Sequence, residues 1–227
     1  NGNKKFLASY SDGKLNGKYI RWYEGGIIKE LDGEYLNNKK HKKWIYWSKN
    51  GQKTEEINYD NGVHQGSHIK WFGEKSDQHK KFHINYKDGN KDGNWHHWYS
   101  SGVDSLKATY LNGEKDGHWI WWRKNGLKDK EGFYKKEKKH GLWTIWNDST
   151  GSAYHKLHEE TYVNDAIDGK VTKWYKEGGL DRQGIMRGKE KEGEWTYWER
   201  GGKRWLKFDY GDGLEKVTLG EIEERDG

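Results

Sequence analysis

Residues 86–99 read YKDGNKDGNWHHWY, and versions of this segment recur along the whole chain. A tyrosine, numbered here as position 0, is followed by Asp-Gly or Asn-Gly at positions 2 and 3, glycine at position 7 and tryptophan at position 12. The position-12 residues are Trp22, Trp47, Trp71, Trp98, Trp122, Trp146, Trp174 and Trp198. The position-0 landmarks are Tyr10, Tyr35, Tyr59, Tyr86, Tyr110, Tyr134, Tyr162 and Met186, and a partial repeat begins at Tyr210. Self-similarity at a fixed period indicates a repeat protein, whose function is to be sought on an extended surface.

The spacing of the landmarks predicts the domain organisation. Successive landmarks are 25, 24, 27, 24, 24, 28, 24 and 24 residues apart. A 24-residue repeat therefore fills nearly the whole chain, with insertions after Phe72 and after Trp146. This unbroken period predicts a single repeat domain over residues 1–227. Because loops on a rigid repeat often carry function, the insertions are candidates for a source of specificity.

Each repeat has the pattern of a β-hairpin. Before the landmark, apolar and polar residues alternate, as in Phe82, His83 and Ile84, which is typical of a half-buried strand. The dipeptides at positions 2 and 3 accept the positive φ of a hairpin corner, and a second strand follows over positions 8 to 13. We therefore predict an all-β fold: an elongated, twisted, single-layer antiparallel β-meander of about eight 24-residue hairpin repeats.

Two rows of aromatic residues are expected on opposite faces of this sheet. The position-12 tryptophans share a face with apolar residues at position 10, such as Ile20 and Ile45, and we predict that they form a structural ladder in the core. Position 9 points the other way and carries Trp44, Trp95, Trp119, Trp143 and Trp195. If exposed, these five form a candidate binding row, because large exposed aromatic patches usually mark binding surfaces. If the sheet curls, both rows become partly buried instead.

The composition limits the class of protein. Charged residues make up 34% of the chain and hydrophobic residues 31%, so the 15% of aromatic residues must supply much of the core. The net charge of +6 permits an anionic partner without requiring one. No segment is apolar enough to span a membrane. Without cysteine, an initiator methionine or a visible signal peptide, a soluble protein of the bacterial cytoplasm and an exported protein are both open.

Lysines cluster at two equivalent turns and define a candidate basic edge. The clusters are Lys39, Lys40, Lys42 and Lys43 in the second repeat and Lys135, Lys136, Lys138 and Lys139 in the sixth. Such an edge suits anionic lipid, an acidic protein or nucleic acid. The alternative, which we favour, is a solvated edge that discourages sheet-to-sheet association. The small net charge argues against nucleic acid as a partner.

The histidines show no metal-binding spacing, and the sequence contains no recognised catalytic motif. His68, His96, His97 and His118 lie in neighbouring repeats, but no spacing matches a zinc site. His155 and His158 lie in or beside the second insertion, where a loop role is equally open. No nucleophile elbow, phosphate-binding loop or HExxH motif is present. We therefore predict no catalytic residue, no metal site, no cofactor and no enzymatic activity.

The repeat in residues 86–99, Tyr-x-x-Gly-x-x-x-Gly-x-Trp-x-x-Trp-Tyr, resembles the MORN repeat. It is most similar to the bacterial variant in YwqK-type antitoxin-like proteins, and the resemblance covers almost the entire chain. The resemblance implies a non-enzymatic scaffold that binds partner proteins or phospholipid headgroups. The chain departs from the pattern at Asn38, Lys42, Glu137 and Asp165, which replace turn glycines. Because the matched motif is structural, it carries over no catalytic residue.

These observations predict a non-enzymatic scaffold that binds a partner protein through an extended aromatic and basic surface. An antitoxin-like or immunity-like role is the refinement that the resemblance implies. The alternative is a carbohydrate-binding module, for glycans or cell walls, in which exposed aromatic rungs stack on sugar rings. A third hypothesis is binding of anionic lipid headgroups, or self-assembly through open sheet edges and the acidic tail of Glu221, Glu223, Glu224 and Asp226. Exposure of Trp44, Trp95 and Trp119 would favour stacking on a glycan or peptide, and their burial would remove that idea.

Overall fold

The computed structural model describes residues 3–73, 79–148, 153–211 and 216–221. Within these ranges every regular element is a β-strand. The chain forms two compact units: unit 1 comprises residues 1–114 and 124–126, and unit 2 comprises residues 115–123 and 127–227. That the chain is a single domain, as the unbroken period indicates, stays a prediction. In the described ranges there is no helix with the length and apolar composition that a membrane span requires.

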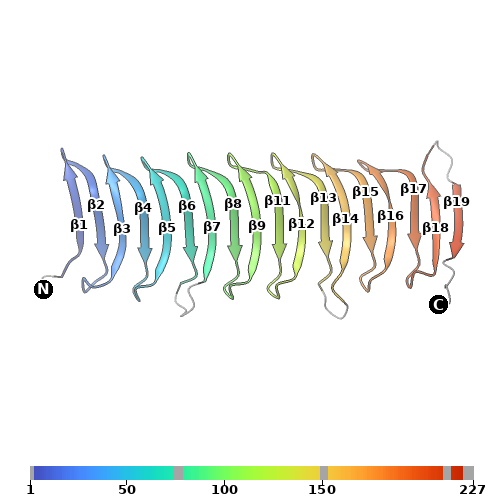
Figure 1. The fold of residues 1–227 in the computed structure, drawn as a ribbon, viewed down its shortest axis with the longest axis horizontal. Coiled ribbons are helices and arrows are strands. Elements are labelled where there is room, and N and C mark those ends of the chain that lie inside the picture. Colours follow the sequence, from blue (N-terminus) through green and yellow to red (C-terminus); the bar gives the residue numbers. More distant parts are fainter. Residues whose placement is uncertain (1–2, 74–78, 149–152, 212–215, 222–227) are drawn as a thin grey trace. The chain divides into compact units, whose positions relative to one another are not determined.

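Unit 1 is an antiparallel sheet in which each strand pairs with the next strand along the chain (Figure 1). Its strands are β1 (Phe6–Ser11), β2 (Lys14–Trp22), β3 (Lys29–Leu36), β4 (Lys39–Trp47), β5 (Lys53–Asp60), β6 (Val63–Trp71), β7 (Lys80–Lys87), β8 (Asn90–Trp98) and β9 (Asp104–Leu111). A two-residue strand, β10 (Glu114–Lys115), follows in the sequence.

Unit 2 continues the same pattern of consecutive antiparallel pairs. Its strands are β11 (Gly117–Trp122), β12 (Lys128–Lys135), β13 (Lys138–Trp146), β14 (Lys156–Val163), β15 (Ala166–Trp174), β16 (Leu180–Arg187), β17 (Glu190–Trp198), β18 (Arg204–Asp209) and β19 (Lys216–Glu221). The all-β class and the antiparallel meander of hairpin repeats are thus confirmed in both units.

The two insertions separate β6 from β7 and β13 from β14. Residues 74–78 and 149–152 of these insertions lie outside the described ranges, so their predicted role in specificity stays a prediction. The acidic tail lies largely outside them as well: Glu223, Glu224 and Asp226 are not described, and Glu221 is described only as the last residue of β19.

The landmark turns from Tyr10 to Tyr162 adopt left-handed backbone conformations at positions 2 and 3, as the sequence predicts for hairpin corners, whereas the turn after Met186 does so only at Gly188. Three turns without glycine at position 3 share this conformation, with φ of 65° at Asn38, 67° at Glu137 and 71° at Asp165. In each, the side chain accepts a hydrogen bond from a main-chain amide of the preceding hairpin, at 2.7, 2.5 and 2.8 Å from Leu15, Lys115 and Lys139. These side chains compensate for the missing glycine by joining neighbouring hairpins.

Strand alternation gives each unit two faces. The first, called here the capped face, carries positions −4, −2, 0, 5, 9 and 11. The second, called the ion-pair face, carries positions −3, −1, 8, 10 and 12. On the capped face Trp44 pairs with Ile57, and on the ion-pair face Ile45 pairs with Glu56. Positions 10 and 12 share a face, as predicted.

The core lies on the capped face, which corrects the prediction for both aromatic rows. Trp44, Trp119, Trp143 and Trp195 expose only 1%, 4%, 5% and 3% of their surface, and Trp95 is half-buried. The prediction that the position-9 row points away from the core is therefore wrong. The prediction that the position-12 tryptophans form the core is also wrong, because all eight are only half-buried.

Position along the strand explains this reversal. Position 9 lies in mid-strand, with a paired neighbour on each side, whereas position 12 is the last residue of its strand in every repeat. A ring at a strand end is followed by a turn, so one of its edges stays open to solvent. Aromatic residues recur at position 9 and at position 12 with the same period, so the period alone did not show which row is buried.

Candidate functional site

Three buried indoles on the capped face lie directly over a glycine at position −2 of their own hairpin. The pairs are Gly33–Trp44, Gly132–Trp143 and Gly184–Trp195, and a β-carbon on any of these glycines would overlap the indole ring. Each indole Nε1 donates a hydrogen bond to the carbonyl of the residue after the glycine, at 3.1, 3.0 and 2.9 Å for Glu34, Phe133 and Ile185. The rings therefore lie flat on the sheet with their polar atom satisfied.

Lysines at position 5 cover these rings. The Lys139 ammonium lies 4.5 Å from the centre of the Trp143 ring and 4.6 Å from that of Tyr162, the landmark of the next repeat. Lys40, Lys91, Lys115 and Lys191 make the same pair of contacts. We call this arrangement of positions 5, 9 and the next landmark the Lys–Trp–Tyr triad. Cation–π contacts of this kind contribute roughly 0.5–1 kcal/mol at exposed sites.

The candidate basic edge is smaller than predicted. Lys40 and Lys139 belong to triads and lie over rings, so they do not contribute to an exposed edge. Lys42 and Lys43 are paired with Glu34 at 2.7 Å and with Glu56 at 3.9 Å. The remaining lysines of the two clusters lie neither over a ring nor in either of these ion pairs. They are Lys39 in unit 1 and Lys135, Lys136 and Lys138 in unit 2, and all four are exposed. In unit 2 the three exposed lysines of the cluster lie at the β12–β13 turn, which also carries the exposed Glu137, 3.4 Å from Lys115.

The histidines named as possible metal ligands are divided between the two faces. His68 and His97 are on the capped face, where they bond to Glu55 at 2.7 Å and to the Ser105 hydroxyl at 2.6 Å. His96 and His118 are on the ion-pair face, where they contact Asp104 at 2.6 Å and Glu131 at 3.3 Å. Among the described residues, no three His, Asp or Glu side chains are arranged to hold a metal ion.

Local packing shifts the pKa values of several of these groups. The hydrogen bond from His68 holds the pKa of Glu55 below its usual range. Burial lowers the pKa of His97 and of His96, the latter despite its bond to Asp104. These shifts follow from pairing and burial within the sheet, and the groups do not converge on a common point.

The histidines beside the second insertion have different surroundings. His155 bridges two loops: its Nε2 lies 3.1 Å from the Tyr175 carbonyl and its Nδ1 lies 3.1 Å from the Asn147 amide. His158 lies on the capped face of β14, 3.9 Å from Glu160. His155 thus has the loop role that the sequence left open.

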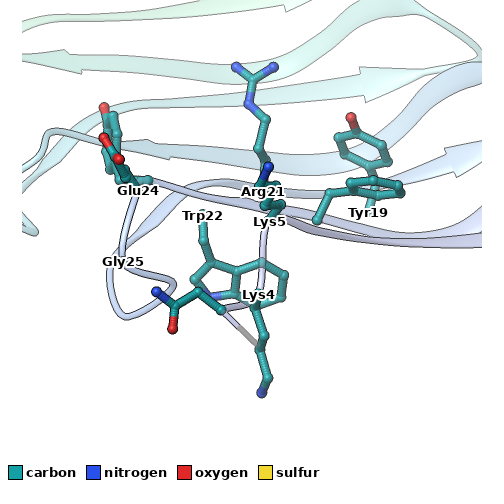
Figure 2. Close-up of a pocket in the computed structure, with 10 residues that line it drawn as sticks. Lys4, Lys5, Tyr19, Arg21, Trp22, Glu24 and Gly25 are labelled. Atoms are coloured by element: carbon teal, nitrogen blue, oxygen red, sulfur yellow. The ribbon is translucent and has the colours of Figure 1, made fainter. Parts of the chain in front are cut away.

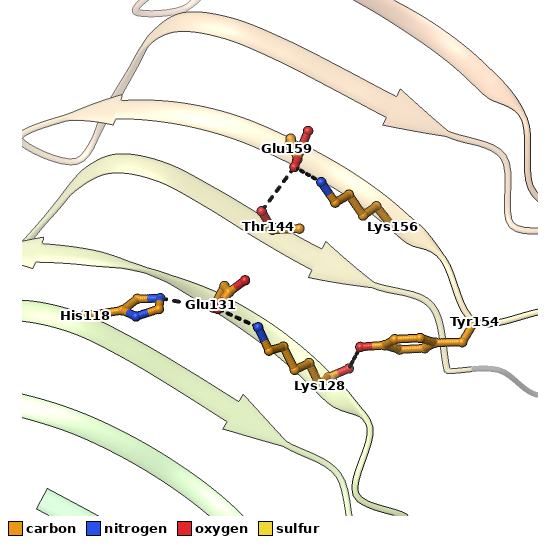
Figure 3. A network of polar contacts seen from close by, with 7 residues as sticks. All are labelled: His118, Lys128, Glu131, Thr144, Tyr154, Lys156 and Glu159. Carbon is orange, nitrogen blue, oxygen red and sulfur yellow. Dashed lines mark hydrogen bonds and ion pairs between the residues drawn. The ribbon is translucent and has the colours of Figure 1, made fainter.

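The ion-pair face takes its name from a repeated pair of charges at positions −6 and −3. Figure 3 shows two of these pairs in unit 2, Lys128–Glu131 at 3.0 Å and Lys156–Glu159 at 2.5 Å. In the same view His118 joins Glu131, and the Tyr154 hydroxyl donates to the Lys128 carbonyl at 3.1 Å. The ring of Tyr154 stacks on the indole of Trp146, and the Lys128 ammonium lies 5.3 Å from the centre of that indole. This position-12 indole is therefore partly covered.

Unit 2 also carries three exposed apolar side chains on its ion-pair face, Phe133, Leu142 and Ile185, which are called here the apolar stripe. These side chains lie on β12, β13 and β16 and are 45%, 48% and 41% exposed. They occupy positions −1 and 8. On β14 and β15, which separate Ile185 from the other two, these positions carry Thr161 and Lys170. In the hairpins of unit 1 the same positions are all polar: Ser9, Lys18, Glu34, Lys43, Asn58, Ser67, Asn85, Asn94 and Thr109. The sequence analysis missed this stripe. Its signal was the change from polar to apolar residues at two fixed repeat positions.

A hollow of about 670 Å³ beside β1 and β2 does not form a comparable site. Figure 2 shows that its lining side chains diverge: Arg21 points away from the sheet in one direction, while Trp22 and Lys4 lie on the opposite side. The Arg21 guanidinium is already bound by both carboxylate oxygens of Glu30, at 2.5 and 2.7 Å. Because the lining groups do not converge, they do not form a pocket around one ligand.

Comparison with protein-family models and with curated proteins found no match for this chain. Membership of the MORN family therefore stays a prediction from the repeat motif.

Proposed function

We propose that this chain is a non-enzymatic repeat scaffold that binds a partner protein, with the apolar stripe of unit 2 as part of the contact surface. The observation that carries the proposal is the exposure of Phe133, Leu142 and Ile185 on one face. Exposed apolar patches with polar surroundings usually mark interaction sites. The motif resemblance to MORN scaffolds, some of them antitoxin-like, points in the same direction.

Charge next to the stripe indicates the character of the partner surface. Lys135, Lys136 and Lys138 are exposed at the turn that joins β12 to β13, the two strands that carry Phe133 and Leu142. A partner that presents apolar side chains bordered by carboxylates would match this surface, and electrostatic complementarity would raise its association rate.

The proposal is tested by affinity capture from the source organism with the wild-type chain and with Phe133→Ser/Leu142→Ser/Ile185→Ser. A captured protein is then purified and titrated against both. We expect the triple variant to bind at least tenfold more weakly, since central apolar contacts dominate interface energy. Val63→Ser is the control, because Val63 is a 46% exposed apolar residue of unit 1 outside the stripe. Equal affinity of the wild-type chain and the triple variant would contradict the proposal.

Carbohydrate binding remains a second candidate, but on a different row of rings. Burial of Trp44 and Trp119 removes the position-9 row as a platform for sugars. The position-12 tryptophans of the ion-pair face are half-buried, so they keep some surface in contact with solvent. Co-sedimentation with peptidoglycan and chitin tests this candidate, and absence of retention on both would count against it.

A further inference from the structure

The series of Lys–Trp–Tyr triads in unit 2 is interrupted at one place. The residues at the three triad positions there are Ile167, Val171 and Met186. Lysine, indole and phenol are thus all replaced by aliphatic side chains in the same triad. We call this place the aliphatic notch.

The structure has an open hollow at this place. A volume of about 180 Å³ on the capped face is lined by the three aliphatic residues, and the buried Trp195 of the next hairpin also lines it. An enclosed apolar cavity of about 150 Å³ holds a benzene ring, and the notch has a similar volume but is open to solvent. The notch therefore has the size of one aromatic side chain.

Positive charge surrounds the notch. Lys173 and Arg182 line it and are directly opposite each other on β15 and β16. Like charges at paired positions destabilise a sheet unless an anion lies near them. Lys191 adds a third cation to the lining.

One carboxylate balances these cations only in part. Glu160 also lines the notch, and it accepts a hydrogen bond from the Tyr162 hydroxyl at 2.6 Å and lies 3.5 Å from the Lys173 ammonium. The contact between Arg182 and Asp181 is long, at 3.8 Å. Three cations against one lining carboxylate leave an excess of positive charge at the opening.

We propose that the aliphatic notch binds an aromatic side chain from an acidic segment of a partner protein. The ring takes the place of the missing indole beside Val171, and flanking carboxylates contact Lys173 and Arg182. This inference deepens the proposed scaffold function by naming a second contact and the chemistry that it selects. The notch is on the capped face and the apolar stripe is on the ion-pair face, so each site is tested independently.

The experiment is a fluorescence-anisotropy titration of the full chain with labelled, end-blocked pentapeptides. The probe is Asp-Glu-Phe-Asp-Glu. The first control, Asp-Glu-Ser-Asp-Glu, lacks the aromatic ring, and the second, Gln-Asn-Phe-Asn-Gln, lacks the negative charges. We expect saturable binding of the probe and at least ~10-fold weaker binding of both controls. Absence of binding of the probe, or equal binding of either control, would overturn the proposal.

Variants locate the binding on the notch. Glu160→Gly/Val171→Trp rebuilds the glycine–indole pair of the other hairpins, so it fills the notch, and we expect at least ~10-fold weaker probe binding. Lys173→Gln/Arg182→Gln leaves the notch open and should weaken binding and reduce its salt dependence. Val171→Ala, which enlarges the notch, and the triple variant of the apolar stripe should both bind the probe as the wild type does. Circular dichroism verifies the fold of each variant. Full binding by the folded filled variant, or by the charge variant if the filled one does not fold, would refute the assignment.

Discussion

At the residue scale, the burial of an indole at position 9 depends on the side chain at position −2 of the same hairpin. Gly33 and Gly132 lie under Trp44 and Trp143. Where an indole has a large partner instead, as Trp95 has in Ile84, the indole is only half-buried. A flat ring needs an empty surface to lie on, and glycine supplies it.

Gly33→Ala tests this complementarity. The added β-carbon would overlap the Trp44 ring, so the indole must move and its hydrogen bond to the Glu34 carbonyl must lengthen. Overpacking of this kind typically costs 1–3 kcal/mol, and we expect a clearly lower urea midpoint, followed by tryptophan fluorescence. Gly73→Ala is the matched control, because no atom lies within 4 Å of a β-carbon there. A midpoint for Gly33→Ala equal to that of the control would contradict this account.

At the element scale, the landmark turns join successive hairpins in two ways. Where position 3 is glycine, its amide donates to a carbonyl of the preceding hairpin, as Gly62 does to Lys40 at 2.7 Å. Where position 3 carries a polar side chain, as at Asn38 and Asp165, that side chain also accepts a hydrogen bond from the preceding hairpin. Adjacent hairpins are therefore held together at their turns as well as along their strands.

Two substitutions at Asn38 separate backbone strain from the hydrogen bond. Asn38→Gly keeps the backbone at positive φ and loses only the bond to the Leu15 amide, whose net value is about 0.5–1.5 kcal/mol. Asn38→Ala loses the same bond and adds about 1–2 kcal/mol for a left-handed conformation. We expect urea midpoints in the order wild type, glycine variant, alanine variant. An alanine variant as stable as the glycine variant would show that the turn relaxes.

At the scale of the whole molecule, half-buried histidines predict that the stability of the fold depends on pH. Burial lowers the pKa of His64, His83, His96 and His97 in unit 1 and of His158 in unit 2. A histidine with a lowered folded pKa stays neutral while the unfolded chain takes up a proton. Its contribution is therefore fully present above the ordinary value of 6.5 and is lost as the pH falls toward the folded pKa.

We expect the urea midpoint of the wild-type chain to fall between pH 7.5 and pH 5. His83→Gln/His97→Gln removes two of the responsible groups, whose present partners are the hydroxyls of Ser67 and Ser105. The variant should show a smaller difference in midpoint between the two pH values, whatever its absolute stability. An unchanged difference would mean that other groups, such as the carboxylates, dominate the pH dependence.

Much of the fold was predictable because its determinants are local in the sequence. Alternation around Phe82 and Ile84 predicts a strand, and Asp88-Gly89 predicts a hairpin corner, without reference to distant residues. The same parity divides Trp95 from Trp98 and places them on opposite faces. The period of 24 residues then extends one hairpin into a meander.

The tertiary structure alone decided which face is the core and where the surface departs from the repeat. Parity separates position 9 from position 12 but does not say which set is inside, since burial depends on neighbouring strands and on the lysines over the rings. Lys139 and Trp143 of β13 meet Tyr162 of β14, and the aliphatic notch joins Ile167 and Val171 of β15 to Met186 of β16. Local patterns determine the path of the chain, whereas exposure and cavities arise from side chains that only the folded sheet brings together.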